Sequence, residues 1–159
     1  MKVTDFARAI NLYFNDYLVN DRGSSPRTIE TYRYAFMQLV EYLEERKGIR
    51  PEKILINDVS RDNIISFLLW LEESKKVSPA TRNQRLAAVR CFAAFLKYER
   101  PEYIEAATQI QGIRPKKSVQ KDISYLKPEG MKLLLSQIDM TTISGRRDYA
   151  MIYVMYTTG

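Results

Sequence analysis

Apolar residues recur along most of the chain at steps of three and four, the spacing that places them on one face of a helix. The first stripe predicts a helix near the N-terminus and consists of Phe6, Ile10, Tyr13, Phe14, Tyr17 and Leu18. The second lies in a helix with Ser25 as N-cap, Pro26 at its first position and Gly48 as left-handed C-cap. The buried side of this second helix is predicted to be Ile29, Tyr32, Phe36, Leu39, Val40 and Leu43.

Three more helices follow by the same reasoning. Ser60 caps one whose inward residues are Ile64, Phe67, Leu68 and Leu71. Ser78 and Pro79 open the next, which runs to about Arg100 with an apolar side of Leu86, Val89, Ala93 and Leu96. A shorter helix begins at Pro101 and ends at Gly112. The pattern predicts an all-α domain of four to five helices over residues 1–111.

The pattern changes after this domain. The run GIRPKKSVQKD has Gly, Pro and four basic residues but no apolar periodicity, which predicts a basic linker over residues 112–123. Pro128 then begins a helix with Met131, Leu134, Leu135 and Ile138 inward. The run RRDYAMIYVMYTTG predicts a helix buried on most sides, with Tyr149, Tyr153 and Tyr156 in a core. Residues 124–159 are too few to bury such a helix, so we expect them to be the start of a larger domain.

Composition indicates a folded protein without a metal site or hydrolytic chemistry of its own. Hydrophobic residues make up 45% and charged residues 28% of the 159 residues. No apolar run approaches the roughly 18 residues that cross a bilayer, and the N-terminus lacks a signal-peptide pattern, so we expect a cytoplasmic protein with no membrane partner. Cys91, the single cysteine, is expected to be a small buried hydrophobe. With no histidine in the sequence, we expect no metal site, no cofactor and no self-contained hydrolytic activity.

The positive charge is concentrated in one stretch. The formal net charge is +6, but Lys75 to Lys121 holds 11 basic and three acidic residues, a local charge of +8. Such a block favours a polyanion such as nucleic acid, because each neutralised phosphate releases counterions. A merely solvated basic face is the alternative that the charge alone leaves open.

Two predicted helices open with nearly the same residues, Ser25-Pro26-Arg27-Thr28 and Ser78-Pro79-Ala80-Thr81. Capped helix starts present unpaired N–H groups and the positive end of the helix dipole, which suits them to bind phosphate. Three arginines could add direct phosphate contacts: Arg27, Arg82 and Arg85. Ordinary capping explains Ser25 and Ser78 equally well.

The polar sides of these two helices could enter a major groove. On the helix that begins after Ser25 this side holds Thr28, Thr31 and Tyr34. On the helix that begins after Ser78 it holds Thr81, Gln84, Arg85 and Ala88. Gln can bridge adenine N7 and N6, and Arg can bridge guanine O6 and N7. Surface helices also carry such residues without a function, so base contact is one of two interpretations.

Four segments, in their order, resemble the tyrosine recombinases or phage-type integrases. SPRTIETYRYAFMQLVEYL looks like the second helix of that family's core-binding domain, and SPATRNQRLAAVRCFAAFLKYE looks like its fourth. YLKPEGMKLLL and GRRDYAMIYVMYTTG look like the opening of its catalytic domain. The segment TRNQRLAAVRCF is most similar to integrases of bacterial mobile elements.

The resemblance implies a SAM-like helical core-binding domain that clamps double-stranded DNA together with the catalytic domain. It places Thr28, Thr31, Tyr34, Thr81, Gln84 and Arg85 at the major groove, and Lys116 and Lys117 along the DNA backbone. Family members act as tetramers on paired inverted-repeat sites.

In this family a tyrosine attacks the scissile phosphate while arginines, a lysine and a histidine stabilise the transition state. None of these catalytic positions is expected before Gly159, so we expect the chain to bind DNA without cutting it. Two alternatives remain, a non-enzymatic DNA-binding regulator related to recombinases and a helical protein-interaction module.

Overall fold

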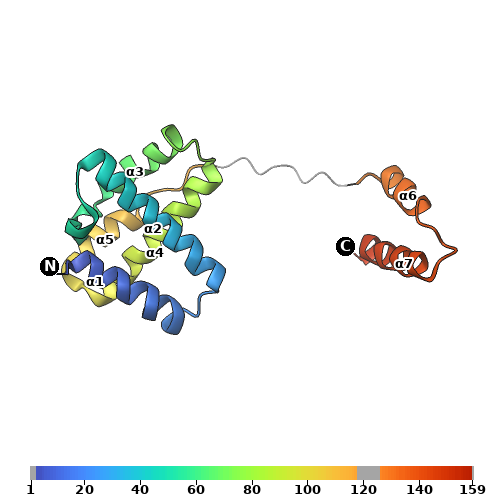
Figure 1. The fold of residues 1–159 in the computed structure, drawn as a ribbon, viewed down its shortest axis with the longest axis horizontal. Helices are drawn as coiled ribbons and strands as arrows, with labels where there is room; N and C mark the ends of the chain where they lie inside the picture. Colours follow the sequence, from blue (N-terminus) through green and yellow to red (C-terminus); the bar gives the residue numbers. More distant parts are fainter. Residues whose placement is uncertain (1–2, 118–125, 159) are drawn as a thin grey trace. The chain divides into compact units, whose positions relative to one another are not determined.

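The computed structural model describes residues 3–117 and 126–158, and every regular element among them is helical (Figure 1). The chain divides into two compact units, Met1–Ser118 and Val119–Gly159, which we call the helical unit and the C-terminal unit. The predicted all-α class is therefore confirmed for the described residues. None of the helices in these two ranges is both long and apolar enough to span a membrane.

The helical unit contains the predicted helices, with a difference in the first of them. The predicted N-terminal helix divides into α1 (Asp5–Leu12) and a π-helix, η1 (Tyr13–Asp21), that continues it directly. The other main helices are α2 (Pro26–Lys47), α3 (Arg61–Glu73), α4 (Pro79–Glu99) and α5 (Ile104–Gln111). Short 3₁₀ turns connect them: η2 (Pro51–Lys53), η3 (Ile56–Asp58) and η4 (Pro101–Tyr103).

The predicted caps are present and set the helix boundaries. The hydroxyl oxygens of Ser25, Ser60 and Ser78 each accept a hydrogen bond from the backbone N–H three residues further on, at 3.2, 3.3 and 3.2 Å. Gly48 ends α2 with φ 66° and ψ 18°, a left-handed conformation that costs an L side chain energy and suits glycine. The local sequence thus decides where these helices begin and where α2 ends.

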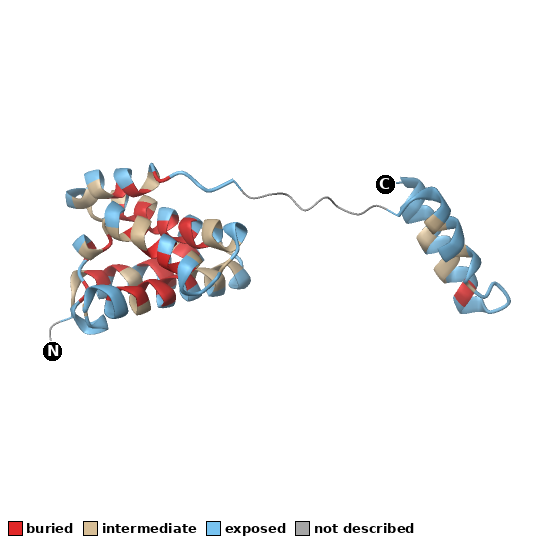
Figure 2. Cartoon of the chain, turned by 90° about the horizontal axis from the view of Figure 1, so that it is seen from above, coloured by how far each residue is buried: buried red, intermediate tan, exposed pale blue. Residues whose placement is uncertain are grey.

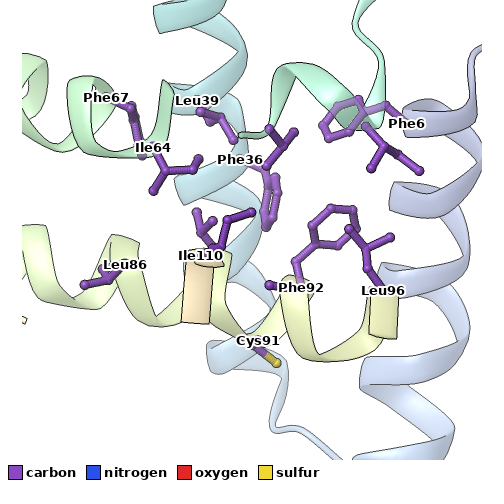
Figure 3. Packing of buried hydrophobic residues seen from close by; sticks show 14 of the residues in the cluster. Phe6, Phe36, Leu39, Ile64, Phe67, Leu86, Cys91, Phe92, Leu96 and Ile110 are labelled. Carbon is purple, nitrogen blue, oxygen red and sulfur yellow. The ribbon is translucent and has the colours of Figure 1, made fainter. Parts of the chain in front are cut away.

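The buried residues of the helical unit are red in Figure 2, and at their centre is an aromatic cluster that includes Phe6, Phe36 and Phe92 (Figure 3). The Phe92 ring of α4 lies 5.2 Å from the Phe36 ring of α2, 5.2 Å from the Tyr13 ring of η1 and 6.2 Å from the Phe6 ring of α1, between ring centroids. Helix α4 contacts α2, α3 and α5. Because α4 is covered from several sides, its buried surface is wider than the predicted stripe and also includes Arg85, Ala88, Cys91, Phe92 and Phe95.

The C-terminal unit is a pair of helices, α6 (Pro128–Ser136) and α7 (Ile143–Thr158). The turn between them depends on Asp139, whose carboxylate accepts hydrogen bonds from the backbone N–H of Thr141 at 2.9 Å and from its hydroxyl at 2.6 Å. These bonds lower the pKa of Asp139. A Cβ on Gly145 would clash with the backbone carbonyl of Asp139, so only glycine fits at this position. Helix α7 begins at Ile143, earlier than the sequence pattern predicted.

Within the C-terminal unit the tyrosines of α7 do not lie in a core, as expected for a segment too short to bury this helix, and their burial in a larger domain stays a prediction. Tyr149 is half-buried, and Tyr153 and Tyr156 are 49% and 46% exposed. Gly145 is the one buried residue of α7, as the mostly pale-blue C-terminal unit of Figure 2 shows. The physical reason is that α6 offers too little surface to cover a helix that is apolar on most sides.

Candidate nucleic-acid interface

Helices α2 and α4 cross in opposite directions, and this sets the geometry of the candidate surface. Arg22, just before α2, contacts Cys91 in the second half of α4. Further along α2, Gln38 contacts Arg85, and Glu41 pairs with Lys75, which precedes α4. In Figure 1 both capped N-termini lie at the right side of the helical unit, the α2 end at the bottom and the α4 end at the top. The two N-termini therefore form separate ends of one surface and do not bind the same anion.

The two N-termini have the same cap geometry. The Ser25 and Thr28 hydroxyl oxygens are 2.9 Å apart, and those of Ser78 and Thr81 are 3.0 Å apart. Each serine also accepts the backbone N–H of its threonine, so ordinary capping occupies both serines. The N–H groups of Arg27 and Ala80 lie in the first turn of a helix and so have no helical carbonyl to bind, and the proline before each of them has no N–H. Each end thus offers one free backbone donor and the positive end of a helix dipole.

The predicted polar face of α2 is exposed in the way a contact surface requires. Arg27 is exposed, Tyr34 is 51% exposed, and Thr28 and Thr31 are half-buried. The Thr31 hydroxyl donates to the backbone carbonyl of Arg27 at 2.9 Å, and its oxygen can still accept a hydrogen bond. These four side chains form a row over the first turns of α2.

The prediction for Arg85 requires correction, because its side chain is not free to reach a base edge. Arg85 is only 8% exposed. Its Nε donates to the Gln38 side-chain oxygen at 2.7 Å, its Nη1 donates to the Gln84 oxygen at 3.1 Å, and its guanidinium lies 4.8 Å from the Tyr34 ring centroid. Burial lowers the pKa of Arg85, although a guanidinium of this kind stays charged at neutral pH. Arg85 joins α2 to α4 and fixes the side chains of Tyr34 and Gln84.

The same crossing explains what the sequence pattern missed on this face of α4. Ala88, expected beside Arg85 on the outer side, is fully buried, since α2 covers this side of α4. Thr81 remains half-buried and Gln84 exposed. Two of the four positions predicted for α4 are therefore open to solvent at least in part, and two are buried.

Arg82 and Lys116 share one carboxylate. Glu72, near the end of α3, lies 2.7 Å from Lys116 Nζ and 3.4 Å from Arg82 Nε. The Arg82 side chain is 12% exposed and that of Glu72 is 20% exposed, so water screens this pair less than a surface ion pair. The Arg82 Nε nevertheless has no aligned hydrogen-bond acceptor within the described ranges, so its attraction to Glu72 is Coulombic.

The first part of the predicted linker is attached to the helical unit. The Asn83 side chain binds the Lys116 backbone twice, donating to its carbonyl at 2.7 Å and accepting from its N–H at 2.9 Å. Ile113 is 6% exposed and belongs to the core cluster. The compact unit thus extends beyond the predicted boundary at residue 111, and Lys117 is exposed at its edge. Residues 118–123 of the predicted linker lie outside the described residues.

Sequence reasoning did not identify Gln38, Glu72, Asn83 or the Lys75–Glu41 pair. The Lys75 Nζ lies 2.6 Å from a Glu41 oxygen, and this hydrogen bond raises the pKa of Lys75. Two weak signals were present: Gln38 is a polar residue beside the buried stripe of α2, and Asn83 is a poor helix former within the first turns of α4. Neither residue type predicts the partner that it contacts, because Arg85 and Lys116 are distant from Gln38 and Asn83 in the sequence.

The fold and this surface define a small all-α domain with two capped helix ends, at α2 and α4, and a basic edge formed by Arg82, Lys116 and Lys117. The sequence profile of the family described as "Phage integrase, N-terminal SAM-like domain" matches residues 10–100, a range that runs from α1 to the end of α4. The chain belongs to this family of phage integrases and tyrosine recombinases.

Individual relatives agree with the family assignment. The chain is 30% identical over 158 residues to y4rC of Sinorhizobium fredii, a protein named as an integrase/recombinase, and this match covers 99% of the chain and 48% of the relative. It is 27% identical over 146 residues to the tyrosine recombinase XerD of Listeria monocytogenes, with 92% and 46% covered. It is 29% identical over 146 residues to the tyrosine recombinase XerC of Herpetosiphon aurantiacus, with 92% and 45% covered.

The chain therefore spans about half the length of these relatives. No solved structure matches it at a significant level.

Proposed function

We propose that the helical unit is the DNA-binding part of a site-specific tyrosine recombinase that acts in DNA integration and recombination. The observation that carries the proposal is the pair of capped N-termini of α2 and α4, together with the exposed or half-buried polar side chains on the first turns of each helix. In this arrangement duplex DNA lies across the crossing of α2 and α4. The two helix ends contact phosphates on either side of a major groove.

Within this surface we assign two kinds of contact. Phosphate contacts come from the backbone and side chain of Arg27, from the N-terminal turn of α4 at Ser78 and Thr81, and from Arg82, Lys116 and Lys117. Base contacts come from Thr28, Thr31, Tyr34 and Gln84, whose small or amide side chains lie on the outer faces. Arg85 acts through Tyr34 and Gln84 and does not touch a base.

The C-terminal unit is proposed to be the opening part of the catalytic domain. Its exposed apolar helix α7 supports this assignment, because such a surface is stable in water only when further protein covers it. The sequence contains no histidine that could serve as a general acid or base beside a tyrosine of α7. We propose that this chain binds duplex DNA in the cytoplasm without cleaving it, and that the whole protein acts as a tetramer on inverted-repeat sites.

Fluorescence anisotropy against salt concentration tests the proposal. We compare the parent chain with a variant in which four proposed phosphate contacts are neutralised, namely R27Q, R82Q, K116Q and K117Q. The slope of log K against log salt should become less negative by about 2 to 4, since each lost phosphate contact contributes about 0.9.

The control neutralises four exposed basic residues away from the surface, namely R8Q, R50Q, K53Q and R61Q. It should keep most of the parent's slope. Equal slopes for the two quadruple variants would contradict the proposed surface, and absence of salt-dependent binding by the parent would favour a protein-interaction module.

A further inference from the structure

The basic edge of the helical unit contains an acidic residue in a position to oppose DNA binding. Glu72 holds both Arg82 and Lys116, with Nζ–Oε1 and Nε–Oε2 distances of 2.7 and 3.4 Å. Its side chain is 20% exposed, so the carboxylate is partly withdrawn from water and its attraction for the two cations is less screened. A DNA phosphate that binds Arg82 or Lys116 must therefore displace or compete with this carboxylate.

The Lys116 backbone is held beside α4, so its ammonium group can leave Glu72 only by a change of side-chain conformation. The two hydrogen bonds from Asn83, 2.7 and 2.9 Å long, hold the Lys116 main chain against the first turns of α4. Ile113, buried three residues earlier, anchors the same segment to the core. The Lys116 side chain remains 55% exposed, so its ammonium group is open to solvent on the side away from Glu72.

We propose that Glu72 is an internal competitor for DNA phosphate, and that Asn83 keeps Lys116 within its reach. Like phosphate, the carboxylate offers anionic oxygens that accept hydrogen bonds from a cation. Glu72 lowers the affinity of this edge for any polyanion and so makes DNA binding depend more on the contacts made elsewhere on the surface. This inference rests on the proposed DNA-binding function.

The test measures duplex DNA binding by the full chain carrying Glu72→Gln. Glutamine keeps the size and an oxygen acceptor but removes the charge. Binding at low salt should tighten by about threefold to fivefold, the range of a weak ion pair, and the salt dependence should steepen by about 1. The matched control is Glu73→Gln, an exposed neighbour on α3 that makes no ion pair within the described ranges, and it should change affinity by less than about twofold.

The sign of the effect decides the question. If Glu72 instead positions the two cations for DNA, Glu72→Gln would weaken binding, and this result would overturn the proposal. An affinity change equal to that of Glu73→Gln would also overturn it, because the effect would then be general repulsion. Parent binding that fails altogether would reject the proposed function itself, which distinguishes the two failures.

Two further variants keep the test independent of folding. Lys116→Gln should weaken binding more in the Glu72→Gln background than in the parent, since the lysine is then free of its internal partner. Asn83→Ala should reduce the gain that Glu72→Gln produces, because Lys116 is no longer held beside the carboxylate. Additive effects in both cycles would contradict the proposal even if each variant were fully folded by circular dichroism.

Discussion

The N-terminal ends of α2 and α4 begin with nearly the same residues and the same cap, but their arginines have different environments. At α2, Arg27 is exposed and makes no ion pair among the described residues. At α4, Arg82 lies 3.4 Å from Glu72, and Arg85 is enclosed by Gln38, Gln84 and Tyr34. The caps depend only on neighbouring residues in the sequence. The environments of Arg82 and Arg85 depend instead on side chains of α3 and α2 that are distant in the sequence.

This difference also changes the meaning of the basic block. The stretch from Lys75 to Lys121 has a formal charge of +8, but Glu41 and Glu72 from the first half of the chain pair with three of its cations, Lys75, Arg82 and Lys116. The field that a polyanion meets is therefore weaker at the α4 end than the sequence indicates. Three ways of testing this contrast follow, from the largest expected effect to the smallest.

The largest effect is expected where an arginine of the α4 end is structural. Gln38→Ala removes the acceptor of the buried Arg85 Nε, and we expect the free energy of unfolding to fall by about 1–3 kcal/mol, since a buried donor is left without a partner. Gln84→Ala is the control, because Gln84 is exposed and water can replace it on Arg85; it should cost about 0.5 kcal/mol or less. Urea denaturation measures both. If the two variants lost the same free energy of unfolding, the buried hydrogen bond from Arg85 to Gln38 would not be what joins α2 to α4.

The caps should behave alike, in contrast to the arginines. Ser25→Ala and Ser78→Ala each remove a hydroxyl that accepts a backbone N–H at 3.2 Å, and each should cost about 0.5–2 kcal/mol in the free energy of unfolding. The two losses should agree within about 0.5 kcal/mol, as the cap geometries match. Thermal and urea unfolding measure both variants. A large loss at one end alone would show that the two ends are not equivalent even locally.

The sequence allowed prediction of those parts that depend on neighbours along the chain. Helix starts at Ser25, Ser60 and Ser78, the end of α2 at Gly48 and the apolar stripes of α2, α3 and α4 are all local patterns, and the structure confirms them. The burial of Arg85 and Ala88 could not be predicted, because it follows from the crossing of α2 and α4. Glu72 pairs with Lys116 and Asn83 binds it across long sequence separations, which no periodicity reveals.

The smallest effect is expected on the affinity for duplex DNA when a single arginine is neutralised, Arg27 at the α2 end or Arg82 at the α4 end. Arg27→Gln should weaken duplex binding by about threefold to tenfold and make the salt slope less negative by about 1, because an unpaired cation contacts phosphate directly. Arg82→Gln should have a smaller effect, since Glu72 already neutralises part of its charge. Anisotropy titrations at two salt concentrations measure both variants. If Arg82→Gln were the more damaging change, the internal pairing would not weaken the α4 end.

The most direct test of the central claim maps the DNA-binding surface on the intact chain. Backbone amide chemical shifts of the ¹⁵N-labelled protein are followed by NMR while a short duplex is added. We expect the largest shifts at the two helix ends of the proposed surface and at the attached segment. These are Arg27 and Thr28 on α2, Ala80 and Thr81 on α4, and Lys116. Shifts concentrated instead on Ala7 and Thr108, in α1 and α5, with the α2 and α4 ends unchanged, would contradict it.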